Sequence, residues 1–327
     1  MTDHDLLRRL ACVLLFLACG LSACQRPAPY DPVTMDRVSF DDADPPRLSE
    51  TTFRVEGASL SAIVYEAQGA GPHPTVILLH GFPGNEKNLD LAQAIRRAGW
   101  NVVFFHYRGS WGSGGRFSFN HVLEDVAAVV SAIAQPDFAT AHRIDPDRLA
   151  LIGHSMGGFA ALVSASELDQ IQCVASLAGA NLGGLAQRSA SPVGAETEVA
   201  VDASVEVDSN AEAEAMAATL DGWSGPIRGA SGAALVAEIA THAERFDTIR
   251  HAPSLARKPI LLIAGRLDQV TPVTQHHDPL VDALLESEAV SLQAEIFEKA
   301  DHSFSGQRIA LALRVTGWLA GACAAAD

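Results

Sequence analysis

A serine framed by glycines is the residue of this 327-residue chain best suited to nucleophilic chemistry. It lies in the sequence Gly153-His154-Ser155-Met156-Gly157, where an apolar run typical of a strand gives way to an alanine-rich run typical of a helix. The pattern G-x-S-x-G at such a junction predicts a sharp turn that raises the serine hydroxyl above a sheet. Glycine suits the flanking positions because it has no Cβ to collide with the neighbouring strand and helix.

A serine hydroxyl is a weak nucleophile, so it needs a general base and an acid that orients the base. The elements that must bring these groups together alternate between strand and helix patterns from Thr51 onward. Short apolar runs such as TVILLHG, NVVFFHYRG and PILLIAG predict strands, and LDLAQAIRRAGW predicts an amphipathic helix. The alternation predicts an α/β fold with a mostly parallel sheet that helices cover on both faces.

These motifs resemble the α/β-hydrolase family over roughly residues 53–320. That family places its triad along the chain in the order serine, acid, histidine. The resemblance implies that Ser155 is the nucleophile, that Asp268 beyond the strand PILLIAG is the acid, and that His302 after AEIFEK is the base. Asp301 adjoins His302, but neighbouring side chains generally diverge, so we expect it to orient the histidine poorly.

An acyl-transfer site also needs two backbone N–H groups that bind the oxygen of the tetrahedral intermediate. One is expected at Met156, directly after the nucleophile. The stretch His80-Gly81-Phe82-Pro83-Gly84 resembles the HGxxG loop of the family, which implies Phe82 as the second donor. Pro83 has no N–H to offer. This chemistry needs no cofactor and no metal ion.

A second glycine-rich stretch, residues 108–115, follows the strand pattern NVVFFHY. No GKS or GKT follows it and no dinucleotide fingerprint is present, so we reject a phosphate cradle. Its position resembles the arginine-glycine loop that borders the active site in the prolyl-oligopeptidase-like and dienelactone-hydrolase-like branch of the family. Trp111 is therefore a candidate for lining an apolar acyl pocket, and plain loop structure is the alternative.

Residues 189–247 interrupt the alternation of strands and helices. The first part, residues 189–227, carries eight Asp or Glu residues and no Lys or Arg. The insertion contains two helical patterns, AEAEAMAATLDGW within this first part and GASGAALVAEIATHAERFD after it. We predict a small helical cap insertion over the site, because long insertions in compact domains are usually functional or disordered. A solvated acidic excursion is the alternative. Trp223 is a candidate for contact with the substrate.

The N-terminus has the pattern of an export signal. Two arginines precede the apolar run of residues 10–20, which is too short to span a bilayer as an ordinary helix, and small residues follow. The sequence Leu21-Ser22-Ala23-Cys24 resembles the bacterial lipobox, which implies cleavage before Cys24 and lipid attachment to it. A plain signal peptide cleaved nearby is the alternative. We expect a signal peptide over residues 1–23, a proline-rich tether over 24–48 and the hydrolase domain over 49–327.

Charge and cysteine content restrict the partners and the compartment. The net charge of −16 makes nucleic acids and anionic membrane surfaces poor partners. Gln25 after Cys24 favours, by resemblance, the outer membrane facing the periplasm. Two of the five cysteines leave with the signal. Cys173 reads as a buried apolar filler, and a bridge between Cys173 and Cys323 stays open.

The sequence thus predicts an exported, lipid-anchored serine hydrolase that cleaves carboxylic esters through an acyl-enzyme on Ser155. Its partners would be a small-molecule ester or short peptide, and the membrane through the lipid anchor. The first alternative is a serine peptidase of the prolyl-oligopeptidase-like branch. The second, from another class, is a non-catalytic surface binding protein on a hydrolase scaffold.

Overall fold

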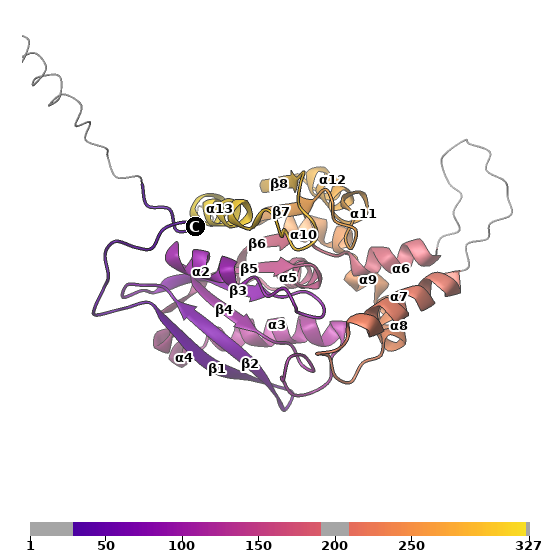
Figure 1. Cartoon of the computed structure of the whole chain (residues 1–327), viewed down its shortest axis with the longest axis horizontal. Helices are drawn as coiled ribbons and strands as arrows, with labels where there is room; N and C mark the ends of the chain where they lie inside the picture. The colour runs from indigo at the N-terminus through magenta and orange to yellow at the C-terminus, as the bar shows by residue number, and fades with distance from the viewer. Residues whose placement is uncertain (1–28, 191–208, 325–327) are drawn as a thin grey trace, which may run out of the picture. The chain divides into compact units, whose positions relative to one another are not determined.

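The computed structural model describes residues 29–190 and 209–324 (Figure 1). The chain divides into two units, residues 1–31 and residues 32–327, and every helix and strand given below lies in the second. The predicted signal peptide, the lipidation site Cys24 and residues 191–208 of the predicted cap lie outside the described residues. Among the described residues, no helix has the length and apolar character that crossing a bilayer requires.

Eight strands of the described chain form one sheet in the order β1-β2-β4-β3-β5-β6-β7-β8. The strand β1 (Arg47–Val55) pairs antiparallel with β2 (Ala58–Glu66), which pairs antiparallel with β4 (Asn101–Phe105). All other neighbours in the sheet are parallel, and they comprise β3 (His73–Leu79), β5 (Ile144–His154), β6 (Ile171–Leu177), β7 (Pro259–Gly265) and β8 (Ser291–Phe297). The predicted α/β fold with a mostly parallel sheet is confirmed.

Helices cover both faces of the sheet (Figure 1). The helices α3 (Phe119–Ile133) and α5 (Met156–Glu167) pack in one core, and α2 (Leu89–Arg97) and α13 (Arg308–Trp318) pack in the other. The strand β5 serves both cores, since Leu151 faces the first and Ile152 the second. The remaining short helices outside the insertion are α4 (Pro136–Ala141), η1 (Thr248–His251), α10 (Ala252–Leu255), α11 (Val273–His276), α12 (Asp278–Glu286) and η2 (Leu319–Cys323).

The insertion after β6 is helical where the structure describes it. It contains α6 (Leu182–Ala190), α7 (Ser209–Trp223), α8 (Gly232–Thr241) and α9 (Ala243–Phe246), which group at the right of Figure 1. The Glu238 carboxylate of α8 accepts hydrogen bonds of 2.9 Å from the backbone N–H groups of Phe119 and Asn120 at the start of α3. A carboxylate is favoured there by the helix dipole. The Arg228 N–H also donates to the Gly109 carbonyl at 2.7 Å, so the insertion is fastened to the core at two places.

The segment before β1 is bound to the domain over much of its length. The Arg97 guanidinium donates to the carbonyls of Pro32 and Val33, and the Gly69 N–H donates to the carbonyl of Asp44 at 2.9 Å. The strand β1 begins at Arg47, inside the range predicted for the tether. From Pro32 onward the predicted tether therefore lies along the domain, because its carbonyls find donors there.

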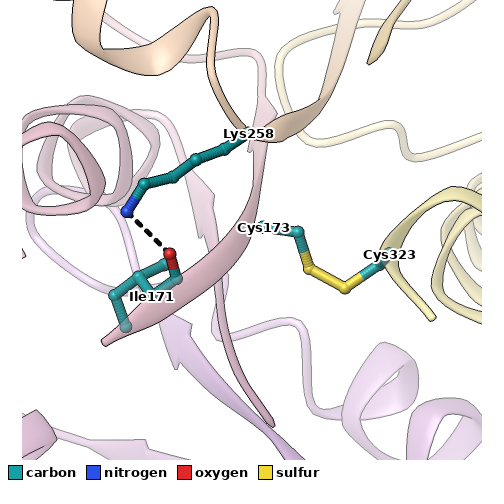
Figure 2. The surroundings of a disulfide bond; sticks show 4 residues. All are labelled: Ile171, Cys173, Lys258 and Cys323. Carbon is teal, nitrogen blue, oxygen red and sulfur yellow. Dashed lines mark hydrogen bonds between the residues drawn. A yellow bond between two sulfur atoms is a disulfide. The ribbon is translucent and has the colours of Figure 1, made fainter. Parts of the chain in front are cut away.

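A disulfide joins Cys173 in β6 to Cys323 in η2, 150 residues further along the chain (Figure 2). Cys173 is fully buried, as predicted, but it forms a covalent cross-link and is not a free apolar filler. Close by, the Lys258 ammonium donates to the carbonyl of Ile171 at 2.7 Å (Figure 2). It also donates to the carbonyl of Leu168 at 2.9 Å. One end of β6 is thus tied both to the start of β7 and to the C-terminal helices.

Removing the disulfide should lower stability. For the double variant Cys173→Ala/Cys323→Ala we expect a free energy of unfolding lower by about 2–4 kcal/mol, because a cross-link that closes a long loop restricts the unfolded chain. Urea unfolding with and without reductant measures this difference. Reductant should bring the wild type to the stability of the variant and leave the variant unchanged. Equal stability of oxidised wild type and variant would contradict the expectation.

Candidate active site

Ser155 occupies the turn between β5 and α5, with φ 57° and ψ −121°. A positive φ is uncommon for a residue that has a side chain, and it stores backbone strain. The flanking glycines allow it: a Cβ on Gly153 would meet the Gly157 carbonyl, and one on Gly157 would meet the Leu79 carbonyl. The turn therefore has the sharp geometry that the G-x-S-x-G pattern predicts, with the serine at its apex.

Asp268 and His302 meet from two separate loops. The Nδ1 atom of His302 lies 2.7 Å from Oδ2 of Asp268, whose side chain is 1% exposed. The other carboxylate oxygen accepts from the backbone N–H groups of Val270 at 2.7 Å and Thr271 at 2.9 Å. Because an ionised carboxylate only accepts, His302 carries its proton on Nδ1 and leaves Nε2 with the lone pair that a general base needs.

The surroundings of Asp268 keep it ionised. Burial by itself raises the pKa of this carboxyl, but the hydrogen bonds from His302 and Thr271 outweigh burial and lower the pKa to about 2. The Thr271 hydroxyl oxygen lies 2.6 Å from Oδ2 of Asp268, so Thr271 is one of the hydrogen-bond partners of this carboxylate. Sequence reasoning did not single out Thr271, although an aspartate that accepts N–H groups two and three residues later is a common turn.

His154 connects the turn of Ser155 to the loop that carries His302. Its side chain is buried, and Nε2 donates to the backbone carbonyl of His302 at 2.8 Å. Burial lowers the pKa of His154 to about 4, so its imidazole is neutral at pH 7. The neighbour of Ser155 in the chain therefore positions the loop that carries His302.

The loop after β3 lies directly against the nucleophile, since a Cβ on Gly81 would lie 2.9 Å from the Cβ of Ser155. The His80 Nδ1 donates to the Gly81 carbonyl at 2.7 Å. The C=O and N–H of a trans peptide point in opposite directions, so this bond turns the Phe82 N–H away from His80. Met156 is the first residue of α5, where an N–H has no acceptor within the helix. The two N–H groups predicted for the oxyanion thus lie on segments that flank Ser155.

A pocket of about 180 Å³ contains Ser155 and His302. Its walls come from the loop of residues 81–86, from His154, Val270 and Ser303, and from Trp223 at the end of α7. The structure thus brings Phe82, Ser155, His302 and Trp223 together, with Asp268 behind the histidine. The helical insertion contributes one wall of the pocket.

Trp111 is not among the residues that line this pocket, and its contacts favour the alternative of plain loop structure. Its Nε1 donates to the Pro83 carbonyl at 2.7 Å, and its ring stacks on His106. The residue has φ 47°, and its backbone N–H donates to the Pro226 carbonyl in the insertion. These contacts place the indole behind the loop of residues 81–86, which it supports.

Comparison with known proteins relates most of the chain to a family of hydrolases. Residues 70–306 match the family model described as serine aminopeptidase, S33. A curated Escherichia coli protein, described as an uncharacterised 31.7 kDa protein in the traX-finO intergenic region, is 32% identical over 126 residues. That match covers 37% of this chain and 42% of the relative, so the chain spans less than half the length of this relative.

Solved structures share the fold. Est1E from Butyrivibrio proteoclasticus, determined with ferulic acid bound, has a TM-score of 0.61 and 17% identity over 84% of this chain and 99% of its own. The acylaminoacyl peptidase of Pyrococcus horikoshii has a TM-score of 0.60 and 16% identity over 85% of this chain and 41% of its own. At these identities the likeness shows the α/β-hydrolase fold, which an esterase and a peptidase have in common. The finer resemblance to the prolyl-oligopeptidase-like and dienelactone-hydrolase-like branch stays a prediction.

Replacing Asp268 and Asp301 one at a time should separate their roles. We expect Asp268→Asn to lower kcat by roughly 10³–10⁴-fold, because a neutral amide neither stabilises the imidazolium nor enforces the productive tautomer. Asp301→Asn should change kcat little, since Asp301 is exposed and accepts from the Ser305 N–H at 2.8 Å. The measurement is kcat on one ester for both purified variants. The reverse order of effects would show that the orienting acid is Asp301.

Proposed function

The chain belongs to the serine aminopeptidase S33 family of hydrolases, and from that premise we propose that it is a serine hydrolase that cleaves carboxylic esters through an acyl-enzyme on Ser155. One observation carries the proposal: the 2.7 Å hydrogen bond between Asp268 and His302, with His302 lining the same pocket as Ser155. This is the arrangement that activates a weak hydroxyl nucleophile.

In the proposed reaction, Ser155 Oγ attacks the carbonyl carbon of the ester while His302 Nε2 takes the hydroxyl proton. The Asp268 carboxylate stabilises the imidazolium that forms. The N–H groups of Phe82 and Met156 bind the oxyanion of the tetrahedral intermediate. The imidazolium then gives its proton to the departing alcohol, and water, activated by the same histidine, releases the acid from Ser155.

Esters are the first candidate substrates because the pocket is small. Its volume of about 180 Å³ is below the roughly 300–1,000 Å³ of common ligand sites and suits a short acyl group. Trp223 forms part of its wall, so we propose that the insertion sets which acyl groups fit. Peptide hydrolysis is the second candidate, supported by the description of the family as a serine aminopeptidase.

Removing the nucleophile tests the proposal. We expect Ser155→Ala to lower kcat on a short-chain ester by about 10⁴–10⁶-fold, because binding and the oxyanion donors alone give little catalysis. A fluorophosphonate probe should label the wild type and leave this variant unlabelled. An unlabelled wild type would favour the non-catalytic binding protein. A higher kcat/KM on an amide than on the ester with the same acyl group would favour the peptidase.

Our proposal extends to location: the enzyme is exported and anchored through a lipid on Cys24, to the outer membrane facing the periplasm. The support is the signal pattern of residues 8–24, with Gln25 after the cysteine. The buried disulfide between Cys173 and Cys323 agrees with export, because disulfides persist chiefly in oxidising compartments.

Replacing the lipidated cysteine should release the protein from membranes. For Cys24→Ser we expect a shift from the membrane fraction to the soluble fraction, or a block in processing. The variant lacks the cysteine that would carry the lipid, and stable anchoring takes more than one acyl chain. Fractionation followed by activity staining measures the shift, and Cys12→Ser, at another cysteine of the N-terminal segment, serves as the control. A mature N-terminus found by mass spectrometry to be unmodified and to lie elsewhere would contradict the expectation.

A further inference from the structure

We propose that Glu86 recognises a cationic group of the substrate, so that the enzyme prefers esters that carry an ammonium charge. This inference rests on the proposed function, because it takes Ser155 as the nucleophile of the same pocket. Glu86 lies in the loop between β3 and α2 and lines the pocket together with Ser155 and His302.

Glu86 supplies the one carboxylate among the described residues that line the pocket. The rest of that described lining includes two imidazoles, of His154 and His302, and no aspartate, lysine or arginine. The whole chain carries a net charge of −16, so its field also draws cations toward the surface. An ammonium group that enters the pocket therefore meets an opposite charge and no lysine or arginine of the described lining.

The Glu86 carboxylate is held in place before any substrate arrives. Its Oε1 accepts a hydrogen bond of 2.7 Å from the backbone N–H of Asn88, and the residue is half-buried. Within the described chain, Oε2 has no hydrogen-bond or ion-pair partner. A group that is already ordered loses less freedom on binding, and an oxygen without a partner can accept the ligand.

Two cations, Lys87 and Arg308, line a neighbouring cavity together with Glu86, but both are engaged elsewhere. The ammonium of Lys87 lies 3.8 Å from the centroid of the Trp111 ring. The guanidinium of Arg308 binds the carboxylate of Asp90 and the side-chain oxygen of Asn88. In the part of the chain that the structure describes, neither forms an ion pair with Glu86, so the negative charge stays available to a ligand.

An aromatic side chain and additional space complete the subsite. Trp223 lines the same pocket and is 43% exposed, and indole faces bind ammonium groups. A second cavity, of about 510 Å³, shares Asn85, Glu86 and Ser303 with the first. Its lining also includes Lys87, Asp90 and Arg308, so we expect the cationic group on the side of Glu86 that faces the first pocket. Glu86 thus stands where a substrate longer than the first pocket would pass.

Two pairs of esters separate charge from shape. Butyrylcholine and 3,3-dimethylbutyl butyrate differ in charge on the alcohol side. The 4-nitrophenyl esters of 4-(trimethylammonio)butyrate and 5,5-dimethylhexanoate differ in the same way on the acyl side. For wild type we expect kcat/KM to be roughly tenfold higher for the cationic member of at least one pair, and the ratio to fall at high salt. Glu86→Gln should remove most of that ratio, chiefly through KM.

Glu286→Gln is the matched control, because it removes the same charge from an exposed position on α12 and should keep the wild-type ratio. Tetramethylammonium should inhibit the wild type competitively, and this test requires no variant. A ratio near one in wild type, or an unchanged ratio in Glu86→Gln, would overturn the inference. Turnover of the neutral esters and fluorophosphonate labelling show that Ser155 is active and each variant folded. If the wild type neither hydrolyses the neutral esters nor reacts with the fluorophosphonate, the proposed function fails, and the inference fails with it.

Discussion

The candidate site depends on the left-handed backbone of Ser155. A non-glycine residue at φ 57° costs of the order of 1–3 kcal/mol and persists only where its surroundings enforce it. Hydrogen bonds do so here: the Ser155 N–H donates to the Leu177 carbonyl at 2.9 Å, and its own carbonyl accepts from Phe159 and Ala180, both at 3.1 Å. These bonds tie β5, β6 and α5 to one residue, so the sheet itself sets the position of the hydroxyl.

The other groups reach this turn through contacts between segments that are distant in the chain. His154 binds the carbonyl of His302, which joins the nucleophile's strand to the base's loop. Arg308 donates to the carbonyl of Ser303 and to the side chain of Asn88, both at 3.0 Å, and so joins the base's loop to the start of α2. These polar links act together with the buried side chains of Ala300 and Phe304, which anchor the same loop in the core.

The sequence was most informative where the interactions are local. Strand and helix patterns follow from side-chain period, and Ser155, Asp268 and His302 stand out because each follows a strand of a parallel sheet, whose carboxyl ends share one edge. The sequence could not predict where the Trp111 side chain points, because this depends on a backbone contact with the insertion more than a hundred residues later. The partner of Cys173 lies 150 residues away, a pairing that spacing alone does not reveal.

The disulfide also determines what a protease could accomplish. Cys173 and Cys323 enclose the helical insertion, the acid loop and the base loop within one covalent ring. A single cut of the backbone anywhere inside that ring opens it and releases no fragment. Asp268 and His302 then remain attached to β6, the strand whose Leu177 carbonyl holds the nucleophile. Because of the cross-link, a single cut breaks the chain only locally and leaves Asp268 and His302 covalently attached to β6.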